Sequence, residues 1–226
     1  MLIPSFTPTR AFLVIAALLG TVTIASSVSP RPFNVHTGYS PAQPIEFSHR
    51  LHAGELGTDC LFCHYGARTS RHAGIPPSSL CMNCHASVSS GFDAFLAERE
   101  LAAEQDREPQ RLISQDILQL YNSMGLDENL EPTGEPPRPI PWVRVHNLPD
   151  FVAFDHSVHV NRGLACATCH GPVQSMERVR QESDLSMGWC VNCHRENGLE
   201  AAMGKRPDGR LPPSQHVSTD CVACHY

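Results

Sequence analysis

The stretch FSHRLHAGELGTDCLFCHYGARTSRHAGIPPSSLCMNCH, residues 47–85, contains an HxxH pair followed by two CxxCH motifs. The same order returns in residues 154–194, which begin FDHSVH and contain CATCH and CVNCH, and one more CxxCH ends at His225. We number these CxxCH motifs 1 to 5 in chain order. All ten cysteines of the 226-residue chain fall in them: Cys60 and Cys63, Cys81 and Cys84, Cys166 and Cys169, Cys190 and Cys193, Cys221 and Cys224. The histidines that end the motifs are His64, His85, His170, His194 and His225.

The CxxCH spacing is typical of covalent heme attachment. Two thiols on one short turn add to the heme vinyl groups, and the imidazole of the next residue binds the iron from the same side. Zinc sites would have to be assembled from separated pairs, and five pairs do not divide evenly into four-cysteine sets. Disulfides would account for the cysteines but not for the five histidines. The motifs therefore predict five covalently bound heme c groups, with the motif histidines as proximal iron ligands.

The iron atoms also need ligands on their distal side. The HxxH pairs, His49 with His52 and His156 with His159, occupy matched positions of the repeat and are the predicted distal ligands of four hemes. The fifth distal ligand stays open between two histidines and two methionines, and a thioether would raise the potential of its heme. These four candidates are His146, His72, Met187 and Met176.

The N-terminus predicts export and a membrane anchor. Arg10 is followed by AFLVIAALLGTVTIASSV, residues 11–28, and no further charge appears before Arg31. Eighteen residues lie at the lower limit of a bilayer-spanning helix and are long for a cleaved signal, although Ala25, Ser26 and Ser27 resemble a cleavage site. We expect one N-terminal span in a bacterial cytoplasmic membrane, with the rest of the chain on the periplasmic side.

The repeat divides the chain into four parts. Residues 1–30 are the predicted anchor, 31–85 the first two-heme module, and 151–226 the second module with the fifth heme. Residues 86–150 form an insert without heme motifs. In the insert we expect a helix over 92–106, a second helix that ends near Gly125, and a proline-rich loop over 127–141.

Composition excludes several classes of function. The formal net charge of −6 gives no basic surface for nucleic acid. The chain contains no P-loop, HExxH, GxSxG or dinucleotide-binding fingerprint. With 41% hydrophobic and 7% aromatic residues, part of them in the anchor, the chain has limited means to build a side-chain core, so we expect the hemes to form the core.

Residues 47–85, the stretch WVRVHNLPDFVAFDHSVHVNRGLACATCHG and the stretch SMGWCVNCHR together resemble the pentaheme cytochrome c subunit of bacterial alternative complex III. The resemblance implies a mainly helical and irregular multiheme cytochrome c fold with little β structure and an N-terminal transmembrane helix. It also implies a quinol-oxidising complex with integral-membrane subunits and an iron-sulfur subunit. The pentaheme subunit would pass electrons to a monoheme cytochrome c or to a small copper or iron protein.

The predicted function is thus an electron-transfer subunit of an oxidoreductase complex that is not catalytic alone. One alternative is a small membrane-anchored quinol dehydrogenase cytochrome, which would contain its own quinol site. Another alternative, from a different class, is a multiheme reductase of a small oxyanion. Such a reductase needs a heme with an open iron position, and the surplus of histidines and methionines here argues against one.

Overall fold

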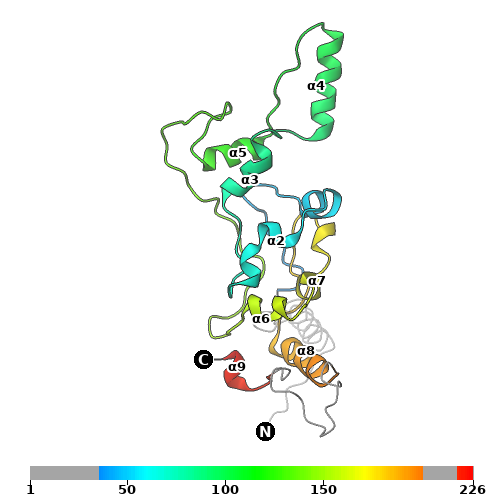
Figure 1. The fold of residues 1–226 in the computed structure, drawn as a ribbon, viewed down its shortest axis with the longest axis vertical. Helices are drawn as coiled ribbons and strands as arrows, with labels where there is room; N and C mark the ends of the chain where they lie inside the picture. Colours follow the sequence, from blue (N-terminus) through cyan, green and yellow to red (C-terminus); the bar gives the residue numbers. More distant parts are fainter. Residues whose placement is uncertain (1–35, 201–217, 226) are drawn as a thin grey trace, which may run out of the picture. The chain divides into compact units, whose positions relative to one another are not determined.

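The computed structural model describes residues 36–200 and 218–225 as short helices joined by long irregular segments (Figure 1). The predicted anchor and residues 201–217, between motifs 4 and 5, lie outside the described residues. Within the described ranges, no helix is both long enough and apolar enough to cross a bilayer.

The described part of the chain is mainly helical, as predicted. The longer α-helices are α3 (Ser78–His85), α4 (Phe92–Glu104), α5 (Gln115–Ser123), α6 (His156–Asn161) and α8 (Met187–Glu200). The shorter ones are α2 (Cys60–Cys63), α7 (Cys166–His170) and α9 (Cys221–Cys224). A π-helix, η1 (Arg50–Glu55), and two 3₁₀ helices, η2 (Tyr65–Arg68) and η3 (Val173–Ser175), complete the set. β structure among the described residues is limited to two isolated bridges, Leu126 with Pro132 and Val152 with His225.

The two HxxH segments form different helices. In the second module, Asp155 caps α6 because its carboxylate accepts a hydrogen bond from the backbone N–H of Ser157 at 2.8 Å. In the first module, the backbone N–H of Leu56 donates to the carbonyl of Leu51 at 2.9 Å, the five-residue spacing of a π-helix. π-helical turns are frequent at functional sites, and this one contains His52.

The two modules contact each other directly. Helix α6 packs against η2, and η1 packs against η3. The backbone N–H groups of His156 and Ser157 donate to the carbonyls of Arg71 and Ser70, each at 3.2 Å. At the second contact Gly54 lies so close to a backbone oxygen of η3 that no side chain fits there. The repeats are therefore joined by backbone contacts at both points.

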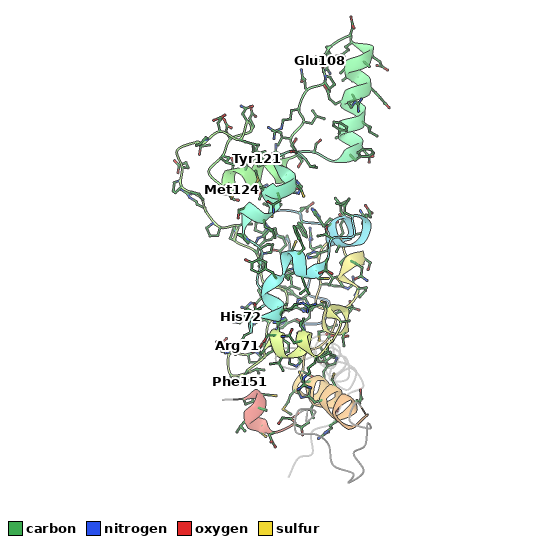
Figure 2. All side chains as sticks on the ribbon, in the orientation of Figure 1. Arg71, His72, Glu108, Tyr121, Met124 and Phe151 are labelled. Atoms are coloured by element: carbon green, nitrogen blue, oxygen red, sulfur yellow. The ribbon has the colours of Figure 1, made fainter. Side chains whose placement is uncertain are left out.

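The insert contains the two expected helices. Helix α4 ends two residues before the predicted limit, and α5 ends just before Gly125, whose φ of 72° suits a residue without Cβ at a helix end. The proline-rich segment after it contains no helix. Tyr121 of α5, labelled in Figure 2, is fully buried and donates its hydroxyl hydrogen to the carbonyl of His85 at 2.5 Å. This hydrogen bond attaches the insert to motif 2.

The side-chain core of the described residues is small. Its buried apolar members are Ala67, Ala102, Leu120, Tyr121 and Met176. Large apolar side chains in or beside the motifs are exposed instead, among them Phe62, Tyr65 and Val222. Side-chain packing alone thus covers little of the apolar surface around the motifs.

Candidate functional site

Three of the four HxxH histidines lie opposite a motif histidine. The ring centroids are 6.0 Å apart for His52 and His85, 6.3 Å for His156 and His170, and 6.0 Å for His159 and His194. Two imidazoles bound to opposite sides of one iron, each at a metal–nitrogen distance of about 2 Å, have centroids about 6 Å apart. All three pairs match that spacing.

A fourth pair follows from the repeat. The pKa of His49 is lowered to about 4. Burial is the largest cause, and the charge of the nearby His64 is the next. In the second module the first HxxH histidine pairs with motif 3 and the second with motif 4. His49 and His64 complete the same scheme in the first module, where His52 pairs with motif 2.

Two phenylalanines hold the HxxH histidines in the same geometry. Phe47 stacks on His52, with centroids 4.3 Å apart, and presents its edge to His49 at 4.8 Å. Phe154 does the same in the second module. It stacks on His159, with centroids 4.6 Å apart, and presents its edge to His156 at 4.9 Å. The FxHxxH pattern therefore fixes both imidazoles, a role of the phenylalanines that spacing alone did not predict.

The Nδ1 atoms of most paired histidines face backbone carbonyls. Among the motif histidines, Nδ1 lies 2.7 Å from the carbonyl oxygen of Gly74 for His64, 2.8 Å from that of Val88 for His85 and 2.8 Å from that of Ser218 for His194. Among the HxxH histidines, Nδ1 lies 2.8 Å from Ser48 for His52, 2.7 Å from Arg71 for His156 and 2.7 Å from Asp155 for His159. A carbonyl only accepts, so Nδ1 carries the proton and Nε2 keeps a lone pair for a metal. This arrangement is characteristic of metal-binding histidines.

Two paired histidines depart from this pattern. The Nδ1 atom of His49 is buried without a hydrogen-bond partner in the described structure. The Nδ1 atom of His170 lies 3.3 Å from Nε2 of His146. Burial lowers the pKa of His170 to about 4, with a smaller contribution from the charge of His146. A neutral imidazole is the form that binds iron, so the low pKa fits a ligand role.

The donor set fits heme c. Adjacent thiols, a following imidazole and a second imidazole at iron-spanning distance are the groups that a six-coordinate heme c requires. The exposed apolar side chains at the motifs suit an apolar macrocycle. The structure forms no disulfide among the cysteines, all of which are described. In the described residues, no three Cys, His, Asp or Glu side chains converge as ligands of a single ion.

The four candidates for the fifth distal ligand lie in different surroundings. His146 lies against His170, and their rings are perpendicular with centroids 4.4 Å apart. His72 is exposed, Met176 is buried with 3% of its surface accessible, and Met187 is 70% exposed at the start of α8. The ring of Phe151, labelled in Figure 2, lies 5.7 Å from that of His225 between centroids. The identity of this ligand stays a prediction.

Cysteines of motif 1 lie close to those of motifs 2 and 3. Burial raises the pKa of Cys60, and Cys166 raises it further through its charge and a hydrogen bond. Burial also raises the pKa of Cys81, with a smaller contribution from Cys63. Motif 1 is thus a neighbour of both motif 2 and motif 3.

Motifs 3, 4 and 5 continue the series. Burial raises the pKa of Cys169, and the charge of the nearby Cys193 raises it further. Burial raises the pKa of Cys190 as well, and the charge of the nearby Cys224 of motif 5 raises it further. The backbone N–H of Ala153 also donates to the carbonyl of Cys224 at 2.8 Å. The attachment sites therefore follow one another in the spatial order 2, 1, 3, 4, 5, which the sequence did not reveal.

Comparison with known proteins agrees with this site. Residues 152–226 match the family described as cytochrome c7 and related cytochrome c. Over 204 residues the chain is 27% identical to the multiheme cytochrome c subunit of a menaquinone reductase from Nitratidesulfovibrio vulgaris, strain Hildenborough. That match covers 81% of this chain and 76% of the relative. Both matches are with c-type cytochromes, and the motifs and their geometry agree with covalently bound heme.

Proposed function

We propose that the chain is a membrane-anchored pentaheme cytochrome c that relays electrons between a quinone-linked membrane complex and an acceptor or donor on the periplasmic side. The observation that carries the proposal is the order of the attachment sites, 2, 1, 3, 4, 5, together with a second imidazole at iron-spanning distance from the motif histidine at motifs 2, 3 and 4. Heme c supplies a one-electron carrier at each site.

With heme bound, the HxxH histidines would keep substrates away from the iron atoms that they ligate. Where an HxxH histidine occupies the distal position, no open coordination site remains for a small oxyanion. The matched carbonyl hydrogen bonds hold these imidazoles in place. The same arrangement favours electron transfer, because a six-coordinate iron changes its ligands little between the two oxidation states. These features support a relay over the reductase alternative.

The proposed setting is a complex similar to alternative complex III. Integral-membrane subunits would bind the quinol, an iron-sulfur subunit would lie nearby, and a monoheme cytochrome c or a small copper or iron protein would dock from the periplasm. The apolar segment of residues 11–28 supports attachment to the membrane. The relative is itself named as a subunit of a menaquinone reductase, which supports a link to quinones.

The name of this relative also favours a second candidate function, in which electrons run in the opposite direction. The relative belongs to an enzyme named for the reduction of menaquinone. In that case the hemes would receive electrons from a periplasmic donor and deliver them to a quinone site in the membrane. The same order of hemes serves either direction.

Rapid mixing of the purified complex separates these possibilities. We expect quinol to reduce the hemes of the complete complex, and we expect removal of this chain to abolish reduction of the acceptor. A chain whose motif 3 cysteines, Cys166 and Cys169, are replaced by alanine should carry four hemes. Electrons from one side should then reduce the hemes on that side of the gap only, because motif 3 joins the two groups.

The outcomes are distinct. Heme reduction by a periplasmic donor, followed by quinone reduction, would support the second candidate. Quinol oxidation by the isolated chain would support the quinol dehydrogenase alternative. Acceptor reduction that is unchanged without this chain would refute the relay in both directions.

A further inference from the structure

The hydrogen bond between His146 and His170 differs from those of the other paired histidines. Six of these have a backbone carbonyl at Nδ1, whereas Nδ1 of His170 lies 3.3 Å from a side-chain nitrogen, Nε2 of His146. The two rings are perpendicular, at 83°. The Nδ1 and Nε2 atoms are thus within hydrogen-bonding distance, and the two rings meet edge to face.

Iron binding determines the direction of this hydrogen bond. If His170 binds iron through Nε2, its proton resides on Nδ1, and Nδ1 can only donate. Nε2 of His146 must then accept and carries no proton. His146 is partly buried, and its own proton resides on Nδ1. This step rests on the proposed heme at motif 3.

We propose that His146 is a positioning residue for the proximal ligand of motif 3, which orients the His170 ring and adjusts the potential of its heme, and that it is not the fifth distal ligand. An acceptor at Nδ1 increases the electron donation of a ligating imidazole, which stabilises the oxidised iron and lowers the potential. His146 therefore lowers the potential at motif 3.

The location gives this adjustment a function. Motif 3 lies between motif 1 and motif 4 in the order of attachment sites, at the contact between the two modules. Electrons moving between the modules pass through this heme in either direction. Its potential relative to its neighbours thus affects the rate of that step.

Two substitutions separate hydrogen bonding from shape. His146→Leu removes the acceptor, whereas His146→Gln offers an amide oxygen in a side chain of similar length. Asn147→Leu is the matched control, because Asn147 is in the same segment and accepts a hydrogen bond from Arg144 at 3.0 Å. The readouts are the midpoint potentials of the individual hemes, the low-spin EPR signals and the number of high-spin hemes, measured on the full chain.

We expect His146→Leu to shift one midpoint potential upward and to alter one low-spin signal, with no high-spin heme. His146→Gln should restore both toward the values of the unmodified chain, and Asn147→Leu should leave them unchanged. A high-spin heme in either His146 variant would overturn the proposal, because it would make His146 an iron ligand. Equal behaviour of the Leu and Gln variants, or unchanged potentials in both, would overturn it as well. Failure of the unmodified chain to bind low-spin hemes would instead refute the proposed function.

Discussion

Alanine substitution of His156 and of His159, one at a time, tests the ligand pairing. The two rings face His170 and His194, at centroid distances of 6.3 Å and 6.0 Å. Each substitution opens one iron coordination site, so we expect one high-spin or weakly ligated heme in each variant, about one fifth of the total. Visible and EPR spectra give that fraction.

The two variants should differ in a second property. His159 bonds within its own helix, to the carbonyl of Asp155, whereas Nδ1 of His156 reaches the carbonyl of Arg71 in the first module at 2.7 Å. One hydrogen bond contributes about 0.5–1.5 kcal/mol net. Loss of the hydrogen bond between His156 and Arg71 should lower the free energy of opening the contact between modules by about 1 kcal/mol. This makes hydrogen exchange at the contact about fivefold faster.

The amide of Ser157 reports this opening because it donates across the same contact, to Ser70, while its second hydrogen bond, to the Asp155 carboxylate, is common to both variants. Its exchange should be about fivefold faster in His156→Ala than in His159→Ala. Equal exchange in the two variants would refute the argument about the contact. Fully low-spin spectra in both variants would refute the ligand pairing.

Three further predictions follow from the heme motifs, the module contact and the insert. The mass of the denatured chain should exceed that of the polypeptide by five heme groups, and four or fewer would contradict the motif assignment. Gly54→Ala should destabilise the contact of η1 with η3 by about 1–3 kcal/mol, measured by urea denaturation, whereas Gly91→Ala, with open space around it, should cost less. Hydrogen bonds from Arg107 and from the backbone of Gln110 lower the pKa of Glu98 to about 2. The carboxylate therefore stabilises the insert fully above about pH 4.5, and this contribution disappears as the pH falls toward 2. Exchange of the Gln110 amide should show that pH dependence in the native chain but not in Glu98→Gln.

Some of the site could be predicted from residue types. The CxxCH motifs and the HxxH pairs can be recognised in the sequence because metal chemistry requires particular side chains at particular spacings. The helices of the insert followed from composition and from the helical spacing of apolar residues, two of which, Leu120 and Tyr121, are buried. The limits of α4 and the end of α5 agree with the predicted ones to within about two residues.

Other features carry no such signal. The carbonyls that accept from Nδ1 belong to the backbone, so any residue type could supply them. The spatial order of the motifs depends on contacts between modules about a hundred residues apart, which local patterns do not encode. His146 was a candidate for iron binding because it is a histidine upstream of motif 3. Its place behind His170 follows only from the folded chain.

The backbone origin of these acceptors also affects how the protein tolerates change. A substitution at Val88, Ser218 or Arg71 alters a side chain but leaves in place the carbonyl that orients a histidine. The orientation of these imidazoles is therefore robust to point mutation as long as the local backbone path persists. The acceptor at His170 is a side chain, so a single codon change can remove it. Motif 3 is thus the place where one substitution can change the environment of a heme without removing a ligand.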